Sequence, residues 1–328
     1  MRARHGSQHA MFEEPRTGDD ETRGDVSKTQ IWRRSISIGV VGVVGAGVIG
    51  TSVAQSLAQT GHTVLLFDVS EDVLERSLAT IRRDARLHRL VSKTGEKVDA
   101  DALLAHIQPS TEMDDLRRAE FVIENVTEDL SVKREVYEAL DRVCPPGCVV
   151  AANTSAIPIT LIAGATSRGP HIVGMHFMNP VPLKPVVEVV RGERTSDETL
   201  TRAIALLAQM GKRAVVVRDS PGFVSNRVLM LTINEAVTVL DEGIASAHDI
   251  DDIFVSCFGH AMGPLETADL IGLDTIVRTL DILANALPGT SFEASPLLRA
   301  MVDRGVLGRK SGEGFYQYAV GEHGAREA

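Results

Sequence analysis

A glycine-rich segment, V-V-G-V-V-G-A-G-V-I-G, contains the pattern G-x-G-x-x-G at Gly45, Gly47 and Gly50. The first glycine allows a tight turn, the second lets a pyrophosphate approach the backbone, and the third lets a helix pack closely on a strand. The pattern alone also occurs in turns that bind nothing. Here a second apolar segment, T-V-L-L-F, ends at the acid Asp68, close to the spacing of roughly 20 residues expected for a ribose-binding carboxylate. Together these features predict a dinucleotide site.

A histidine and a carboxylate could supply acid–base chemistry beside such a cofactor. His176 ends an apolar segment in G-M-H-F-M-N-P, and Glu188 lies on the next predicted strand. Hydride transfer from an alcohol needs a base for the hydroxyl proton, and a carboxylate on the far ring nitrogen would fix the tautomer of that base. A buried structural histidine is the alternative, and the predicted cofactor cleft favours catalysis.

Two uncharged polar side chains extend this candidate site. Ser155 follows a predicted strand in A-N-T-S, at the strand end where ligands of α/β sheets usually bind. Asn226 lies in a predicted helix shortly after Pro221. Each is also compatible with a local cap or a hydrogen bond between helices.

Alternating strands and helices must position these residues. Apolar segments predict strands after the glycine-rich one at 63–67, 121–126, 148–153, 172–176, 186–190 and 213–217. Helical patterns with capping residues separate them, including a long helix from Ser70 and a short one over 99–106. From Pro221 onward the pattern is helical, and Pro221 suits a helix start.

The pattern predicts an α/β chain with three parts. Residues 1–35 show no apolar period and are expected to form a flexible extension. Residues 36–218 are expected to form a Rossmann-type, doubly wound sheet with an inserted helical pair. Residues 219–328 are expected to form an all-α domain.

Composition excludes several classes of function. The 328 residues carry a formal net charge of −10, which argues against a nucleic-acid partner. The chain contains neither an apolar run of about 18 residues for a membrane span nor the apolar core of a secretory signal. The three cysteines, Cys144, Cys148 and Cys257, lack metal-ligand spacing and are expected to be small buried thiols in the cytoplasm.

Seven segments together carry a resemblance to a known family. They are G-V-V-G-A-G-V-I-G, V-I-E-N-V-T-E, A-N-T-S-A-I-P-I-T, G-M-H-F-M-N-P-V-P, D-S-P-G-F-V-S-N-R, G-P-L-E-T-A-D-L-I-G-L-D and G-R-K-S-G-E-G-F-Y. From Gly39 to Tyr318 the chain resembles the 3-hydroxyacyl-CoA dehydrogenase family, of the 3-hydroxybutyryl-CoA dehydrogenase type.

The resemblance implies an NAD-dependent enzyme of fatty acid metabolism that interconverts (S)-3-hydroxyacyl and 3-ketoacyl thioesters. It also implies that the helical residues 219–328 serve substrate binding and form a homodimer. It implies that His176 is the catalytic base with Glu188 as its partner, and that Ser155 and Asn226 hold the substrate oxygen and the histidine. The residues that it places around the cofactor are Gly45, Gly47, Val48, Ile49, Gly50, Asp68, Glu128, Lys133, Ser155, Asn179 and Lys310.

Two departures from the family pattern leave the substrate's handle open. The loop after His176 has V-P-L-K-P-V-V-E where the family typically has V-P-V-M-K-L-V-E. The helical pair carries arginines, among them Arg82, Arg83 and Arg86, where the family places serine and lysine for CoA. A basic face would suit a CoA phosphate or an acidic acyl carrier protein, as in polyketide extender-unit pathways, and a solvated helix face is equally compatible.

Two further functions remain as alternatives. A dehydrogenase of a free hydroxy or sugar acid could share the fold and the His–Glu pair. A non-catalytic NADH-binding protein is disfavoured, because His176, Glu188, Ser155 and Asn226 are all retained.

We predict that Asp68 selects NAD over NADP, because a carboxylate repels a 2′-phosphate. Asp68→Ala is expected to bring the ratio of kcat/KM with NAD to kcat/KM with NADP closer to one. Both values are measured with the same substrate. Equal use of both cofactors by the wild-type protein would show that the ribose assignment is wrong.

Overall fold

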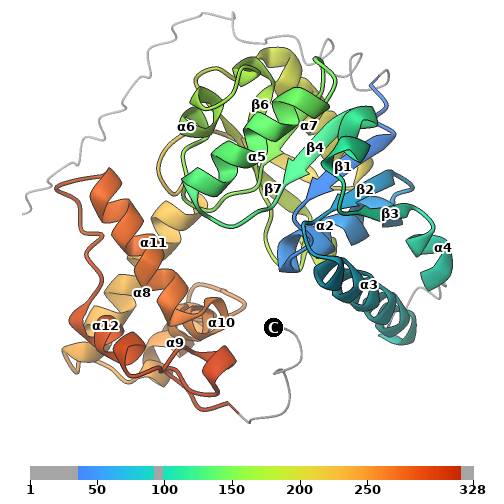
Figure 1. The fold of residues 1–328 in the computed structure, drawn as a ribbon. Coiled ribbons are helices and arrows are strands. Elements are labelled where there is room, and N and C mark those ends of the chain that lie inside the picture. The colour runs from blue at the N-terminus through green and yellow to red at the C-terminus, as the bar shows by residue number, and fades with distance from the viewer. Residues whose placement is uncertain (1–35, 92–98, 319–328) are drawn as a thin grey trace, which may run out of the picture. The chain divides into compact units, whose positions relative to one another are not determined.

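The computed structural model describes residues 36–91 and 99–318 (Figure 1). The predicted flexible extension, residues 1–35, lies outside the described residues. Within the described ranges, the chain forms a sheet flanked by helices and then a group of helices.

One sheet of eight strands has the order β3-β2-β1-β4-β5-β6-β7-β8. Its strands are β1 (Val40–Val44), β2 (Thr63–Phe67), β3 (Ile107–Ser110), β4 (Phe121–Glu124), β5 (Val149–Ala152), β6 (Ile172–His176), β7 (Val186–Arg191) and β8 (Arg213–Arg218). Neighbouring strands run parallel except β6 and β7, which are antiparallel. The carboxyl ends of the parallel strands β1, β2, β4, β5 and β6 therefore share one edge, where ligands of such sheets bind.

Helices connect these strands along the chain. They are α2 (Val48–Gln59), α3 (Glu71–Val91), α4 (Ala100–Leu104), α5 (Leu130–Val143), α6 (Ile159–Gly164) and α7 (Asp197–Gln209). Alternate residues such as Leu65 and Phe67 join side chains of α5 and α6 in one core cluster. The pair α3 and α4 follows β2, as the sequence predicts, and α3 packs on α2.

The helices α8 (Ser225–Asp241), α9 (Ala247–Ser256), α10 (Pro264–Ile271), α11 (Leu273–Ala286) and α12 (Pro296–Asp303) share a second core cluster. The buried carboxylate of Asp269 accepts hydrogen bonds from the amides of Phe315 and Tyr316 and from the hydroxyl of Tyr318. Burial raises the pKa of Asp269. These hydrogen bonds attach residues 315–318 to α10.

The predicted fold class, a Rossmann-type sheet followed by helices, is confirmed, with three differences in detail. Strand β3 was not predicted, because I-Q-P-S has little apolar periodicity. The second half of the sheet is mixed, since β7 runs against β6. The expected helix start at Pro221 is wrong: α8 begins at Ser225, because Phe223 takes a left-handed φ of 53° that a helix cannot contain.

The glycine-rich turn between β1 and α2 has three different backbone requirements. Gly45 has a φ of +89°, which side-chain-bearing residues rarely adopt. A Cβ on Gly50 would lie 1.8 Å from the carbonyl oxygen of Gly45, whereas a Cβ on Gly47 would meet nothing within 4 Å. The fold therefore requires glycine at the first and third positions, and the second is open on the protein side.

We predict that Gly50→Ala lowers the free energy of unfolding by about 2–3 kcal/mol, since the added methyl must displace backbone. Gly47→Ala is the matched control. It is expected to change stability by less than about 0.5 kcal/mol and to weaken NAD binding. Urea unfolding and cofactor titration measure the two effects. Equal stability of the two variants would contradict the prediction.

Candidate active site

The centre of the candidate site is a histidine–carboxylate pair on two antiparallel strands. His176, the last residue of β6, lies directly opposite Glu188 of β7 in the strand register. The ring Nδ1 is 3.1 Å from Glu188 Oε2, and both residues are buried. Antiparallel pairing thus places the two side chains beside each other on one face of the sheet.

Glu188 also binds the start of α8. Its Oε1 accepts hydrogen bonds from the amides of Val224 at 2.9 Å and Ser225 at 3.2 Å, and the Ser225 hydroxyl donates to Oε2 at 2.6 Å. Burial alone would raise the pKa of Glu188, but the hydrogen bonds from His176, Ser225 and the two amides outweigh it and lower the pKa to about 2. The carboxylate is therefore ionised at neutral pH.

The outer ring nitrogen of His176 faces an exposed serine. Its Nε2 lies 3.2 Å from the hydroxyl oxygen of Ser155. Asn226, the second residue of α8, donates from Nδ2 to the Ser155 carbonyl oxygen at 2.8 Å. The structure thus brings together the four residues that were predicted to be catalytic, namely His176, Glu188, Ser155 and Asn226. Their catalytic roles stay predictions.

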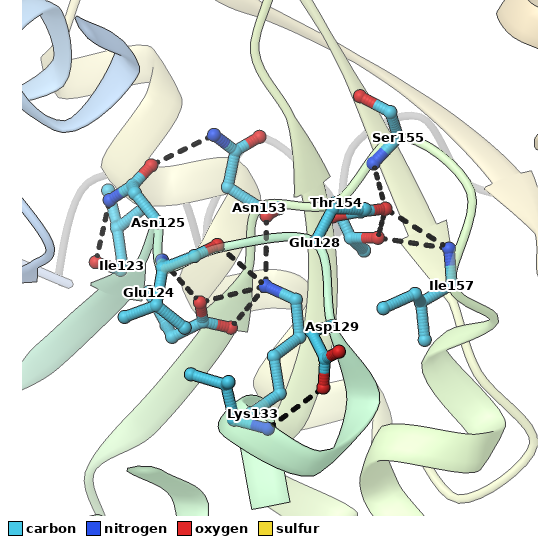
Figure 2. Close-up of polar contacts among 12 residues, drawn as sticks. Ile123, Glu124, Asn125, Glu128, Asp129, Lys133, Asn153, Thr154, Ser155 and Ile157 are labelled. Carbon is cyan, nitrogen blue, oxygen red and sulfur yellow. Dashed lines mark hydrogen bonds and ion pairs between the residues drawn. The ribbon is translucent and has the colours of Figure 1, made fainter. Parts of the chain in front are cut away.

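The Ser155 loop is held by Glu128 (Figure 2). One carboxylate oxygen, Oε1, accepts hydrogen bonds from the Thr154 hydroxyl and from the amides of Ser155, Ala156 and Ile157. Glu128 was predicted to line the cofactor site, and the structure shows it in contact with this loop. A carboxylate gathering consecutive amides fixes the backbone that carries Ser155.

Lys133, another predicted cofactor residue, is fully buried. Its ammonium contacts both carboxylate oxygens of Glu124 (Figure 2), at 2.8 Å and 3.0 Å. Both side chains are 0% exposed. Burial raises the pKa of Glu124, and the ammonium of Lys133 opposes that rise. Lys133 also approaches the carbonyl oxygens of Val126 and Asn153. Through these contacts Lys133 links the carboxyl ends of β4 and β5.

Amide side chains join the carboxyl ends of β4, β5 and β6. Asn153 donates to Asn125 Oδ1 at 2.8 Å and accepts from the amide of Phe177, the residue after His176, at 3.1 Å (Figure 2 shows the two asparagines). The loop after Phe177 includes the exposed Asn179. Hydrogen bonds from Lys212 hold the following residues of this loop. There the buried ammonium of Lys212 donates to the carbonyl oxygens of Val181 and Lys184.

The turn between β1 and α2 fits a dinucleotide diphosphate. The helix begins at Val48, Ile49 and Gly50, and its N-cap, Gly47, provides no side-chain hydrogen bond. The first amides of an uncapped helix favour an anion. Asp68, at the end of β2, accepts from the amide of Ala46 at 2.8 Å, so its carboxylate adjoins the same turn.

Other predicted residues lie away from the histidine. Lys310 is in a short 3-10 turn, η4 (Arg309–Ser311), and pairs with Asp274 of α11 at 2.5 Å. Arg82, Arg83 and Arg86 are exposed on α3. Arg82 pairs with Asp101 and Arg83 with Asp84, both in partly solvated ion pairs.

Sequence reasoning missed Ser225, although the segment D-S-P-G-F-V-S-N-R contains it. Placing the helix start at Pro221 left Ser225 inside the helix, whereas it is the first residue of α8 and contacts Glu188. Cys257 is exposed, so the expectation that all three thiols are buried is wrong for this one. Within residues 36–91 and 99–318, no group of histidine, cysteine and acidic side chains could hold a metal ion. No helix of these ranges has the length and apolarity to cross a membrane.

The fold and this geometry are those of a dinucleotide-dependent α/β oxidoreductase. Residues 40–220 match the family model of the 3-hydroxyacyl-CoA dehydrogenase NAD binding domain, and residues 222–318 match that of its C-terminal domain. The chain belongs to the 3-hydroxyacyl-CoA dehydrogenase family, which confirms the resemblance and the predicted cofactor, NAD.

Similar proteins include one bacterial relative and two bacterial proteins of known structure. A probable 3-hydroxybutyryl-CoA dehydrogenase of Bacillus subtilis is 42% identical over 276 residues, which is 84% of this chain and 96% of the relative. The structure of (S)-3-hydroxybutyryl-CoA dehydrogenase PaaH1 from Ralstonia eutropha has a TM-score of 0.81 at 41% identity, covering 86% of this chain and 100% of that one. FadB2 of M. tuberculosis has a TM-score of 0.82 at 36% identity, covering 87% and 100%.

We predict that Glu188 stabilises the fold in a pH-dependent way. Its pKa in the folded protein, about 2, is below the ordinary 4.5, so its contribution is complete above about pH 4.5 and is lost as pH falls towards 2. Each pKa unit corresponds to about 1.4 kcal/mol, which sets the contribution near 3 kcal/mol.

Urea unfolding of the wild type and Glu188→Gln at several pH values tests this prediction. The stability difference between the two proteins is expected to shrink as pH falls through this window. A difference that is independent of pH would contradict it.

Proposed function

We propose that this protein catalyses the NAD-dependent interconversion of (S)-3-hydroxyacyl and 3-ketoacyl thioesters, with 3-hydroxybutyryl-CoA as the reference substrate. One observation carries the proposal: the His176 ring is held between the Glu188 carboxylate and the exposed hydroxyl of Ser155. Family membership and the substrates named for the relatives support the choice of thioester.

The hydrogen bonds define how His176 acts in this reaction. An ionised carboxylate only accepts hydrogen bonds, so in the neutral ring the proton lies on Nδ1, towards Glu188, and Nε2 carries a lone pair. In the oxidation direction Nε2 takes the proton of the substrate hydroxyl. The Ser155 hydroxyl, 3.2 Å from Nε2, marks where the substrate oxygen binds, and Glu188 stabilises the imidazolium that forms.

NAD, when bound, accepts the hydride released from the substrate carbon. The amides at the start of α2 hold its diphosphate, and Asp68 holds its adenosine ribose. Glu128 and Asn179, in the loops that follow β4 and β6, would line the nicotinamide half. Lys133 would act on the nicotinamide half indirectly, through its ion pair with Glu124. Lys310 of η4 is proposed to line the nicotinamide half as well.

The thioester handle binds on the basic face of α3. Arg82, Arg83 and Arg86 are exposed there, and the two ion pairs made by Arg82 and Arg83 are solvated pairs worth about 0–1 kcal/mol each, so a phosphate can displace them. The same face favours an acidic acyl carrier protein as a second candidate handle. A free hydroxy acid has no group for this face, and a non-catalytic protein has no need of the His176–Glu188 arrangement.

The protein acts as a homodimer through its helical part. Eight exposed large hydrophobic side chains lie on or near α8, α9 and α10: Val224, Val228, Leu231, Ile244, Ile253, Val255, Phe258 and Leu270. These helices pack on one another, and exposed apolar side chains on adjacent helices support an interaction face. The acyl-CoA substrates in the names of the bacterial relatives support a place in fatty acid metabolism. We propose a cytoplasmic location for this reaction.

NADH oxidation with three classes of substrate tests the function: acetoacetyl-CoA, an acetoacetyl carrier protein and free 3-keto acids. We expect turnover of acetoacetyl-CoA by the wild type and a loss of about 10²–10⁴ in kcat for His176→Ala, because the positioned base is removed. NADH binding, followed by fluorescence, is expected to be retained in this variant.

Each outcome has a distinct meaning. If only the carrier-protein substrate were turned over, the handle would be the carrier protein and not CoA. Turnover of only free acids, or a fully active His176→Ala variant, would overturn the proposed function or the assigned base.

A further inference from the structure

The first residue of α8 reaches the buried His176–Glu188 pair with its side chain. The hydroxyl oxygen of Ser225 lies 2.6 Å from Glu188 Oε2 and 3.3 Å from His176 Nδ1. It therefore contacts the one carboxylate oxygen that also binds the ring. The backbone amides of Val224 and Ser225 bind the other oxygen, Oε1.

Proton accounting determines the direction of these hydrogen bonds. A serine hydroxyl has one proton, and the carboxylate can only accept, so the hydroxyl donates to Glu188 Oε2. The Nδ1 proton of His176 then points between Glu188 Oε2 at 3.1 Å and the lone pairs of Ser225 at 3.3 Å. The ring nitrogen thus has two acceptors, one on the sheet and one on α8.

This serine differs from the serines that cap other helices. Three of those accept a hydrogen bond from an amide in the first turn of their own helix: Ser196, Ser246 and Ser295. Ser225 instead directs its hydroxyl to a carboxylate on β7. Its side chain is thus bound to the acid–base pair, while the amides of the same segment already dock the helix on Oε1.

We propose that Ser225 is a positioning residue for His176: its hydroxyl holds the Glu188 carboxylate and the Nδ1 edge of the ring, and so makes the orientation of the base depend on α8. This inference rests on the proposed function of the same site. Because Ser225 and Asn226 are adjacent, α8 fixes both sides of the arrangement. Ser225 holds the inner ring nitrogen, and Asn226 holds the carbonyl group of the residue that faces the outer one.

Two isosteric variants separate the hydroxyl from side-chain volume. Ser225→Thr keeps a hydroxyl, whereas Ser225→Val has the same shape without one. We expect Ser225→Val to lower kcat about tenfold, the scale of one hydrogen bond to a charged group, with KM and the Kd for NADH changed less than about twofold. Ser225→Thr is expected to recover most of the lost kcat. Thermal unfolding of both variants checks that each is folded.

A second measurement needs no substrate. The ring nitrogen chemical shifts of His176, assigned by their loss in His176→Gln, report which nitrogen carries the proton. The wild type and Ser225→Thr are expected to show the Nδ1–H tautomer, and Ser225→Val a shift towards a mixture. If the wild type turned over no thioester, the proposed function would fail while the nitrogen shifts still tested the positioning.

Two results would overturn the inference. One is Ser225→Val with the wild-type kcat and unchanged nitrogen shifts. The other is Ser225→Thr as impaired as Ser225→Val in both measurements, because the effect would then follow side-chain branching and not the hydroxyl.

Discussion

The carboxylate of Glu188 is the interaction on which the candidate site depends. One oxygen binds the histidine of the neighbouring strand and a serine of α8, and the other binds two amides at the start of that helix. A single side chain therefore fixes the ring on one side and the helix on the other. Because Asn226 follows Ser225, the position of that helix also determines the contact with the Ser155 carbonyl group.

This dependence has an electrostatic basis. Removing a carboxylate from water is costly unless hydrogen bonds replace the lost solvation. Glu188 receives donors from a ring, a hydroxyl and two amides, and the amides belong to the positive end of the α8 dipole. Among residues 36–91 and 99–318, its hydrogen-bond partners include no lysine or arginine, so the carboxylate stays charged without one and its charge remains available to an imidazolium.

Much of this arrangement was predictable from the sequence. The glycine spacing and the acid at Asp68 identify the cofactor turn, because Gly45 and Gly50 meet backbone requirements of the turn and Gly47 leaves room for a pyrophosphate. The histidine at a strand end and the carboxylate on the next strand were also visible. Their direct opposition was not, because it depends on β7 running antiparallel, and strand direction leaves no mark in a short apolar segment.

Other features depended on contacts between distant residues. Because Phe223 is in a left-handed conformation, α8 starts after it, at Ser225. At this first position of the helix the Ser225 hydroxyl contacts Glu188. Lys133 was expected at the cofactor on the strength of the family resemblance. Its complete burial against Glu124 follows from packing beneath the strand ends, which periodicity does not report.

The pair of Glu124 and Lys133 has a consequence for how the chain can evolve. Both side chains are 0% exposed, so losing either one leaves its partner as a lone charge inside the protein, at a cost of about 3–5 kcal/mol. That is a large fraction of the whole stability of a typical domain. Stepwise drift at either position is therefore blocked, and homologous sequences are expected to keep both residues or to replace both together. Covariation between these two positions would be the record of that constraint.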